Sequence, residues 1–359
     1  MRPDVIIVGA GLIGLTMARE LQARGMRVEV WDQSQAGHES SWAAAGMLAG
    51  TMLSLNRRLR PAAQASLTLY PEFIAQLETE TGQKTGYRAS GTLLLAPSDE
   101  ENTFRRDFSG LDGVDWLSPS DVEALEPELQ YSGTVALLSR DHSVNSRQLV
   151  TACRTSAALR GIPIHEGRQV TRLHALPGGT WSVESEKHRQ VVAHVINAAG
   201  AWAGQIDLPQ PACPVRPVKG QALQVEAAPW QLRHVIIAQD FYLVPRAAGS
   251  ILVGATQEEA GFDKSVCPEQ LSQLQARARA CVPILKNAPV VEMWAGLRPA
   301  TPDGLPLLGA SGYPGYWLAA GHFREGILLA PWTAHTMANL LADLPVPAEV
   351  AAFSPARFQ

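Results

Sequence analysis

The most informative stretch of the sequence is Val5-Ile6-Ile7-Val8-Gly9-Ala10-Gly11-Leu12-Ile13-Gly14. Its first four residues are apolar and β-branched, as in a buried strand, and its glycines follow the spacing GxGxxG of a tight turn. The following residues, Leu15 to Arg24, have helical character, and Gly25 supplies a helix stop. We therefore predict a strand, a glycine turn and a helix over residues 5–25.

A second β-branched run follows this helix. It covers residues 27–31 and is followed by Asp32, which lies 18 residues beyond Gly14. A strand, helix and strand with an acid at about this offset is typical of a dinucleotide site, where glycines admit a pyrophosphate and the acid binds ribose hydroxyls. A carboxylate would repel a 2′-phosphate. The pattern favours FAD or NAD over NADP and does not separate the first two.

Two further stretches favour a flavin. Residues 40–47, Ser-Ser-Trp-Ala-Ala-Ala-Gly-Met, place small side chains where the backbone could lie against a large planar ring, although a small-residue helix packed on the sheet is the alternative. Residues 321–326, Gly-His-Phe-Arg-Glu-Gly, precede an expected helix over about 327–341, with Pro331 in its first turns. The positive end of that helix would stabilise an anionic reduced flavin; a plain capping turn is the alternative.

The rest of the chain changes pattern more than once. A strand at 91–95 and a helix at 120–125 do not continue the strand–helix–strand alternation of the first residues. A helix capped by Asn145 and a strand at 190–196 return to that alternation. Alternating strands between 214 and 300 indicate a mostly antiparallel sheet.

We therefore predict an α/β fold in which a Rossmann-like cofactor domain is interleaved with an α+β substrate domain. The cofactor domain is expected over residues 1–85, 145–212 and 296–359, and the substrate domain over 86–144 and 213–295.

Composition and spacing exclude several functions. The chain has 359 residues, 46% of them apolar, and a formal charge of −4, which provides no basic field for nucleic acid. Its four cysteines form no CxxC pair and its histidines show neither HxH nor HxxxH spacing, so we expect no metal site and no catalytic triad. We also expect no membrane span, and cytoplasmic localisation because the first residues lack a signal-peptide pattern.

The sequence resembles the D-amino acid oxidase family of flavoproteins, and within it the glycine oxidases of thiamine thiazole synthesis. The resemblance extends over nearly the whole chain and rests on six segments in the family's order: residues 5–14, 40–47, 197–202, 242–246, 294–304 and 321–331. It implies non-covalent FAD and oxidation of a small amino acid by hydride transfer to the flavin. The products would be an imine or 2-oxo acid and, after reoxidation by O₂, hydrogen peroxide.

The same resemblance assigns residues to roles. Arg298 would hold the substrate carboxylate and Tyr242 would support it, the alternatives being a surface ion pair and an ordinary strand residue. The residues expected to contact substrate are Arg298, Tyr242, Met47, Arg324 and Gln257. The residues expected to contact FAD are Gly9, Gly11, Leu12, Ile13, Gly14, Asp32, Gln33, Ser40, Ser41, Ala45, Gly46, Met47, Val170, Ala199, Gly200, Trp202, Gly321, His322, Phe323, Arg324, Glu325, Gly326, Ile327 and Leu328.

Some residues depart from the family pattern. Asp32 stands where a longer Glu is common, and Gln257 stands where an apolar Met is common, which leaves the preferred amine open. No cysteine occurs from 298 to 330, which argues against a covalent flavin. Other interpretations are a quinone-reducing dehydrogenase of D-amino acids or secondary amines, an NAD-dependent dehydrogenase, and a flavoprotein with a binding role only. The partners expected are a small amino acid or amine and O₂; a homo-oligomer is compatible with the sequence.

Overall fold

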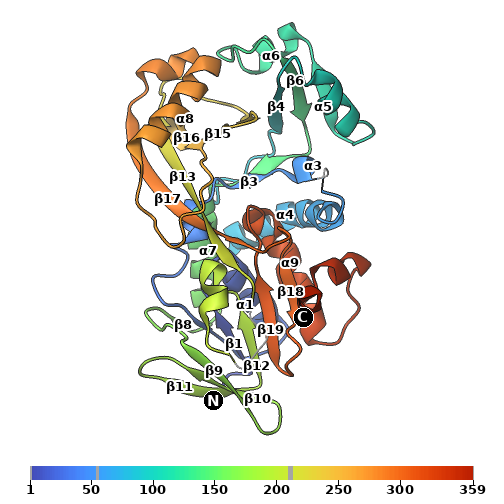
Figure 1. The fold of residues 1–359 in the computed structure, drawn as a ribbon, viewed down its shortest axis with the longest axis vertical. Helices are drawn as coiled ribbons and strands as arrows, with labels where there is room; N and C mark the ends of the chain where they lie inside the picture. The colour runs from blue at the N-terminus through green and yellow to red at the C-terminus, as the bar shows by residue number, and fades with distance from the viewer. Residues whose placement is uncertain (1, 54–55, 209–212, 359) are drawn as a thin grey trace.

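A computed structural model describes residues 2–53, 56–208 and 213–358 of the chain. Two sheets dominate it, one mostly parallel and one mostly antiparallel, stacked along the longest axis of the molecule (Figure 1). The chain passes between the two sheets several times, and both termini lie at the parallel one. This arrangement confirms the predicted α/β fold with an interleaved, mostly antiparallel second part.

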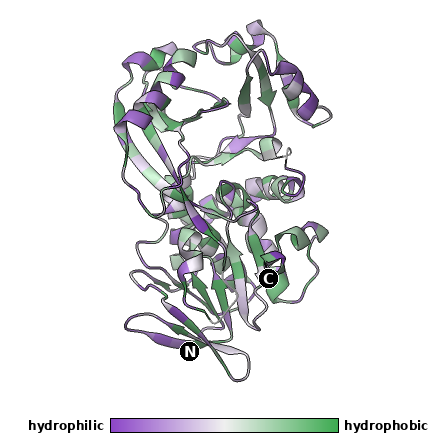
Figure 2. Cartoon of the chain, viewed as in Figure 1, coloured by the Kyte–Doolittle hydropathy of each residue, from purple (hydrophilic) through white to green (hydrophobic). Residues whose placement is uncertain are grey.

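The parallel sheet has six strands among the described residues, in the order β18-β19-β12-β1-β2-β8, and only the β18–β19 pair is antiparallel. The strands are β1 (Val5–Val8), β2 (Val28–Trp31), β8 (Ile164–His165), β12 (His194–Asn197), β18 (Leu307–Ala310) and β19 (Tyr316–Ala320). All four residues of β1 are buried, as expected for a central strand covered on both faces. The sheet is the green, apolar centre of this half in Figure 2.

The strand predicted at 190–196 is two strands. Residues 189–192 form β11 (Arg189–Val192), which joins β9 (Arg172–Leu176) and β10 (Thr180–Glu184) in a separate antiparallel sheet. Only the residues after Ala193 pair with β1.

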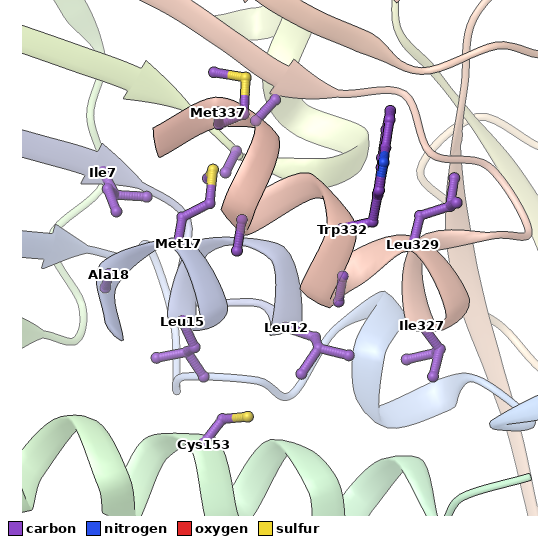
Figure 3. Close-up of a cluster of buried hydrophobic side chains, with 14 of the residues drawn as sticks. Ile7, Leu12, Leu15, Met17, Ala18, Cys153, Ile327, Leu329, Trp332 and Met337 are labelled. Atoms are coloured by element: carbon purple, nitrogen blue, oxygen red, sulfur yellow. The ribbon is translucent and has the colours of Figure 1, made fainter. Parts of the chain in front are cut away.

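Helices α1 (Leu12–Ala23), α4 (Arg60–Thr81), α7 (Ser146–Leu159) and α9 (Gly326–Leu341) share one core against the parallel sheet. Figure 3 shows Leu12, Leu15 and Met17 of α1 between α9 and Cys153 of α7. Helix α7 begins as predicted, because the Asn145 side chain accepts the N–H groups of its first turn. The core therefore fixes the start of α1 and the start of α9 relative to the sheet.

Pro331 lies inside α9 and not in its first turn. It has no N–H to donate to the carbonyl of Ile327, four residues earlier. That carbonyl instead accepts the hydroxyl of Tyr70, and the carbonyl of Leu328 accepts the hydroxyl of Ser66 at 2.5 Å. Both hydroxyls come from α4, so a neighbouring helix supplies the donor that proline lacks.

The second sheet has eight strands in the part of the chain described, in the order β17-β13-β16-β15-β14-β4-β6-β5, and only β14–β4 is parallel. The strands are β4 (Thr92–Ala96), β5 (Val114–Leu117), β6 (Thr134–Leu138), β13 (Arg216–Glu226), β14 (Val235–Ile237), β15 (Tyr242–Pro245), β16 (Ser250–Gly254) and β17 (Val290–Ala300). Helices α5 (Glu101–Asp107), α6 (Pro119–Leu125) and α8 (Pro268–Cys281) surround it.

The exact division into domains stays a prediction. Strand β17 runs without interruption across the boundary predicted at residue 296, and the boundary predicted at 212 lies outside the described residues. Strands β13 and β17 are the longest of the sheet and pair along their whole length, with Gly220 opposite Gly296 and Val218 opposite Arg298. They carry the second sheet down to the parallel one.

No helix of the described residues is long and apolar enough to cross a membrane. Within the same residues, no group of three or more His, Cys, Asp or Glu side chains could hold a metal ion.

Candidate active site

A cavity of about 680 Å³ lies where the carboxyl ends of β1, β2, β12 and β19 meet the large sheet. Ligands of open α/β sheets bind outside the carboxyl ends of the parallel strands, and this volume is ordinary for a ligand site. Three walls enclose the cavity: the glycine turn before α1, the segment 40–47, and strands β13, β15 and β17 with the turn before α9.

The glycine turn is closely packed against the end of β12. Gly9 has φ of +106°, and a Cβ on it would lie 2.4 Å from the carbonyl oxygen of Ala198. A Cβ on Gly14 would lie 1.9 Å from the carbonyl oxygen of Gly9. The turn is held by the Asp32 carboxylate, which accepts the Ala10 N–H at 2.7 Å. Only glycine fits at positions 9 and 14, and Asp32 fixes the loop as well as facing the cavity.

Two helices present N-termini to this cavity. The N-cap residue of α1 is Gly11, which has no side chain, and the described residues supply no hydrogen-bond acceptor for the N–H groups of Gly11 and Ile13. Helix α9 also lacks a side-chain cap, and its first residues, Gly326 and Ile327, line the cavity. Free N–H donors and the helix dipole both favour a negatively charged group at such positions.

Segment 40–47 forms the second wall. Helix α2 (Ser40–Ala43) is one turn long, and the residues after it leave the helical conformation before β3 (Met47–Leu48), so the helix does not continue over 44–46. The hydroxyl of Ser41 accepts the N–H of Leu12 at 2.9 Å, which ties the wall to α1.

The carbonyls of residues 43–46 in this wall all accept hydrogen bonds from the surrounding protein. The donors are Trp294 Nε1 to Ala43 at 3.1 Å, Ser146 Oγ to Ala44 at 2.6 Å, an Arg246 nitrogen to Ala45 at 2.6 Å and the Val144 N–H to Gly46 at 2.8 Å. The described residues supply no acceptor for the N–H groups of Ala45 and Gly46. The wall therefore has free donors and small side chains, which suits a planar, acceptor-rich ring.

The turn before α9 is strained, and burial keeps its histidine neutral. Phe323 has φ of +48°, an uncommon conformation for a residue with a bulky side chain. His322 is buried beside Thr333, with Nε2 and Oγ1 3.1 Å apart, and burial lowers the pKa of its imidazole to about 3. Burial raises the pKa of the Glu325 carboxyl to about 7, against the effect of Arg324. His322 is therefore neutral at physiological pH.

Arg298 supplies a cation to the third wall. It makes no ion pair with the described residues; its guanidinium instead donates to the backbone carbonyls of Thr256 at 3.1 Å and Lys219 at 3.3 Å. Burial lowers the pKa of Arg298 and raises the pKa of Tyr242, while each group opposes the shift of the other. An arginine stays protonated in proteins, so this wall of the cavity has a positive charge with no ion-pair partner among the described residues.

Two glycines make room for these side chains. A Cβ on Gly220 would lie 2.2 Å from Arg298, and a Cβ on Gly254 would lie 2.2 Å from the ring of Tyr242. Neither glycine was predicted as a site residue, and nor were Arg246 and Trp294, which hold segment 43–46. Arg246 and Trp294 lie in segments that carry the family resemblance, but their contacts depend on how the strands pair, which the local sequence does not give.

Most of the predicted site residues line the cavity. Three do not: Gly14, Leu328 and Gln257. Gly14 packs against the glycine turn, and Leu328 points into the core of α1 and α9. Gln257 is exposed and accepts a hydrogen bond from Arg324, which does line the cavity. Contact of the lining residues with a cofactor or substrate stays a prediction.

The chain matches the family model described as FAD dependent oxidoreductase, or DAO, over residues 4–340. It belongs to this family. The protein is therefore an FAD-dependent enzyme, which excludes the NAD-dependent and non-catalytic interpretations. The free helix N-termini, the glycine turn and segment 43–46 fit this cofactor, since FAD combines a diphosphate with a planar ring. None of the described residues that line the cavity is a cysteine.

Named relatives extend the comparison. The chain is 33% identical to a glycine oxidase from Pseudomonas putida, covering 99% of both chains. It is 34% identical to the bifunctional protein ThiO/ThiG of Trichormus variabilis and spans about half, 56%, of that protein's length. The crystal structure of glycine oxidase from Geobacillus kaustophilus superposes with a TM-score of 0.92 at 32% identity, covering 99% of each chain. The DAO enzyme therefore shares its whole fold with solved glycine oxidases.

Proposed function

We propose that the enzyme oxidises glycine or another small amino acid to its imine, with O₂ as electron acceptor and hydrogen peroxide as product. The observation that carries the proposal is Arg298, a charged side chain without a counter-ion in the FAD cavity. Similarity to glycine oxidases over the full chain supports the same substrate class. The imine would hydrolyse to a 2-oxo acid and ammonia, or be used in thiamine thiazole synthesis.

Arg298 would bind the substrate through its carboxylate. A guanidinium can donate two parallel hydrogen bonds to a carboxylate, which fixes the orientation as well as the position of the ligand. The hydroxyl of Tyr242 lies close enough to Arg298 to affect its pKa, and it would donate to the same carboxylate. The two residues together would hold the Cα of the amino acid in one place.

The cofactor would be held mainly by backbone. We infer that the diphosphate lies at the start of α1 and that the ring system lies along residues 43–47 and the turn before α9. FAD, when bound, supplies the two-electron acceptor. The positive end of α9 favours negative charge on the adjacent ring, which makes the oxidation easier.

The amine of the substrate must be neutral before it can be oxidised. His322 is a poor base for this purpose, because burial keeps its pKa at about 3 and Thr333 engages its Nε2. Positioning by Arg298 and the charge of the site would therefore promote the reaction without a dedicated base. The amine would lose its proton before hydride transfer.

Small substrates suit this cavity best. Near Arg298 and Tyr242 the wall is formed by Gly220 and Gly296 together with Met47, and Thr256 adds a polar group. Gly220 provides room only for the Arg298 side chain itself, which would leave limited space for a substrate side chain.

The test is a substrate and acceptor panel with the purified holoenzyme. Glycine, sarcosine, D-alanine and D-proline are each supplied in air, and ammonia or methylamine release and peroxide are measured. The same amines are then supplied without O₂ but with a soluble quinone. Peroxide formation with a small amino acid supports the proposal. Turnover with the quinone but not with O₂ would show that the enzyme uses a quinone as its electron acceptor. No turnover with any of the amines would overturn the proposal.

A further inference from the structure

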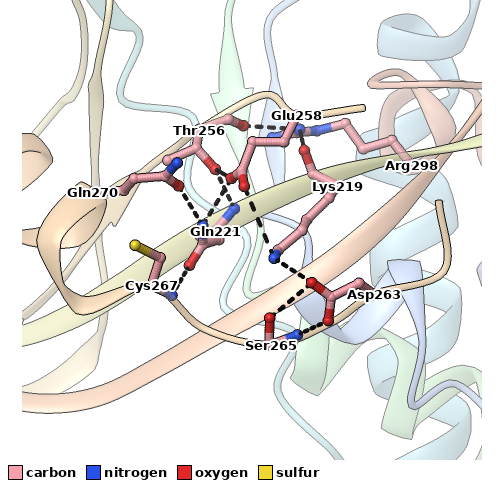
Figure 4. Close-up of polar contacts among 9 residues, drawn as sticks. All are labelled: Lys219, Gln221, Thr256, Glu258, Asp263, Ser265, Cys267, Gln270 and Arg298. Atoms are coloured by element: carbon pink, nitrogen blue, oxygen red, sulfur yellow. Dashed lines mark hydrogen bonds and ion pairs between the residues drawn. The ribbon is translucent and has the colours of Figure 1, made fainter. Parts of the chain in front are cut away.

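The carbonyls that orient Arg298 belong to two segments that a buried polar network fastens together (Figure 4). One carbonyl is that of Lys219 on β13; the other is that of Thr256, in the segment that follows β16. Lys219 and Glu258 exchange backbone hydrogen bonds of 2.9 and 3.0 Å, so the second segment runs alongside β13. The orientation of Arg298 therefore depends on the register of these two segments.

Gln221 is the centre of the network. Its side chain is fully buried, with 0% exposure. Its Nε2 donates to Glu258 Oε1 at 2.8 Å and to Gln270 Oε1 at 2.6 Å, and its Oε1 accepts the Cys267 N–H at 2.6 Å. The amide thus uses both donors and its acceptor, and it ties β13 to the segment after β16 and to the start of α8.

Thr256 and Glu258 extend this connection toward Arg298. The Thr256 hydroxyl accepts the Gln221 N–H at 2.9 Å and donates to Glu258 Oε1 at 2.5 Å. Lys219 is 3% exposed, with its Nζ 3.3 Å from Asp263 and 3.9 Å from Glu258, so both carboxylates lie within ion-pair distance of the lysine. The Glu258 charge also acts on Arg298, but among the described residues the network holds the Arg298 acceptors without an ion pair to its guanidinium.

We propose that Gln221, with Glu258 and Thr256, is a positioning residue that fixes the guanidinium of Arg298 in the orientation that receives the substrate carboxylate. The proposal rests on the proposed function, because it requires Arg298 to bind a carboxylate. Gln221 does not line the cavity, so it acts through the Lys219 and Thr256 carbonyls alone. Gln221→Leu keeps the approximate volume and removes all three side-chain hydrogen bonds.

The probe is acetate, a carboxylate without an amine, titrated into the holoenzyme and followed by the visible flavin spectrum. Loss of the buried hydrogen bonds is expected to raise the Kd for acetate roughly tenfold in Gln221→Leu. The Kd for glycine in anaerobic flavin reduction should rise by a similar factor, with a smaller change in the limiting rate. Thr256→Val, which changes little in shape, should move both Kd values in the same direction by less.

Gln275→Leu is the matched control. Gln275 is also a buried glutamine, on α8, but its Nε2 has no hydrogen-bond partner among the described residues. It should leave both Kd values unchanged, whatever it does to the melting temperature. If Gln221→Leu does not fold, the Kd values of Thr256→Val for acetate and glycine test the positioning role instead.

Arg298→Lys separates the two proposals. If this variant binds acetate as the wild type does, Arg298 is not the carboxylate site, and the proposed function loses its main support together with the positioning role. If Arg298→Lys weakens acetate binding while Gln221→Leu and Thr256→Val retain the wild-type Kd, only the positioning role is overturned.

Discussion

The glycine turn before α1 and the wall around Arg298 are built in different ways. At the glycine turn, one short segment supplies the functional groups as backbone N–H donors, and glycines make room for them. At the Arg298 wall, side chains from separate strands converge, and each relies on a glycine in another strand for its space. The glycine turn is formed by residues close together in the sequence, whereas the Arg298 wall forms only after β13, β15, β16 and β17 have paired.

This difference predicts how each region fails. Damage to the turn should remove the cofactor and with it all activity. Damage to the Arg298 wall should leave a yellow, folded enzyme with weakened substrate binding.

The largest effect is expected from Gly9→Ala. A Cβ there would lie 2.4 Å from a backbone oxygen at φ of +106°, so the turn must move, at a cost of a few kcal/mol. The purified variant should contain little or no FAD, measured as the ratio of flavin to protein absorbance. Gly25→Ala is the control, because Gly25 has φ of +86° but nothing within 4 Å of its Cβ position. Equal FAD content in both variants would contradict the assigned role of the turn.

Arg298→Ala should come next. Loss of a charge-assisted pair costs about 2 kcal/mol, or roughly 30-fold in KM for amino acids. FAD content should remain at the wild-type level, in contrast to Gly9→Ala. A simple amine without a carboxylate is the control substrate, and its KM should not change. An unchanged KM for glycine would place the carboxylate site elsewhere.

Gly220→Ala tests whether the space beside Arg298 matters as much as its charge. The added methyl would lie 2.2 Å from the guanidinium, which must swing away from its two carbonyl acceptors. We expect KM for glycine to rise about tenfold, since a misplacement of about 1 Å in a binding site can cost up to a hundredfold. Arg298→Ala combined with Gly220→Ala should be no worse than Arg298→Ala alone. Additive losses would show that Gly220 acts on something other than Arg298.

The smallest catalytic effect is expected from His322→Gln. Since its pKa is about 3, the imidazole is neutral throughout the working range, and the pH profile of flavin reduction between pH 6 and 9 should be unchanged.

Stability, in contrast, should respond to acid. The native pKa of His322 is depressed below the unfolded value of 6.5, so the unfolded state binds more protons between pH 6.5 and 3. The wild type should therefore lose stability as pH falls through this window, and His322→Gln should lose less. Thermal melts of both proteins at several pH values measure this difference. Identical slopes would contradict the buried, neutral state of His322.

Local features of the sequence predicted the first strand, the glycine turn and the helices of the parallel-sheet half well. The strand and helix around Gly9 and the cap at Asn145 depend on residues within a few positions of one another. Residues of the Arg298 wall were harder to predict. Gly220 and Arg298 are 78 positions apart, and they meet because β13 pairs with β17 in one register.

Periodicity places a residue near a site without giving the direction of its side chain. Leu328 follows residues that line the cavity, yet its side chain packs in the core. Pro331 is accommodated in the second turn of α9 because Tyr70, on another helix, donates to the Ile327 carbonyl, and helix propensity does not describe such a tertiary contact.

The most direct test of the central claim is anaerobic mixing of the purified holoenzyme with glycine, followed by the visible absorbance of its flavin. We expect glycine to bleach the oxidised flavin bands and admission of air to restore them with formation of peroxide. We also expect Arg298→Ala to need far more glycine for the same bleaching. Flavin bands that persist with glycine, sarcosine, D-alanine and D-proline alike would contradict it.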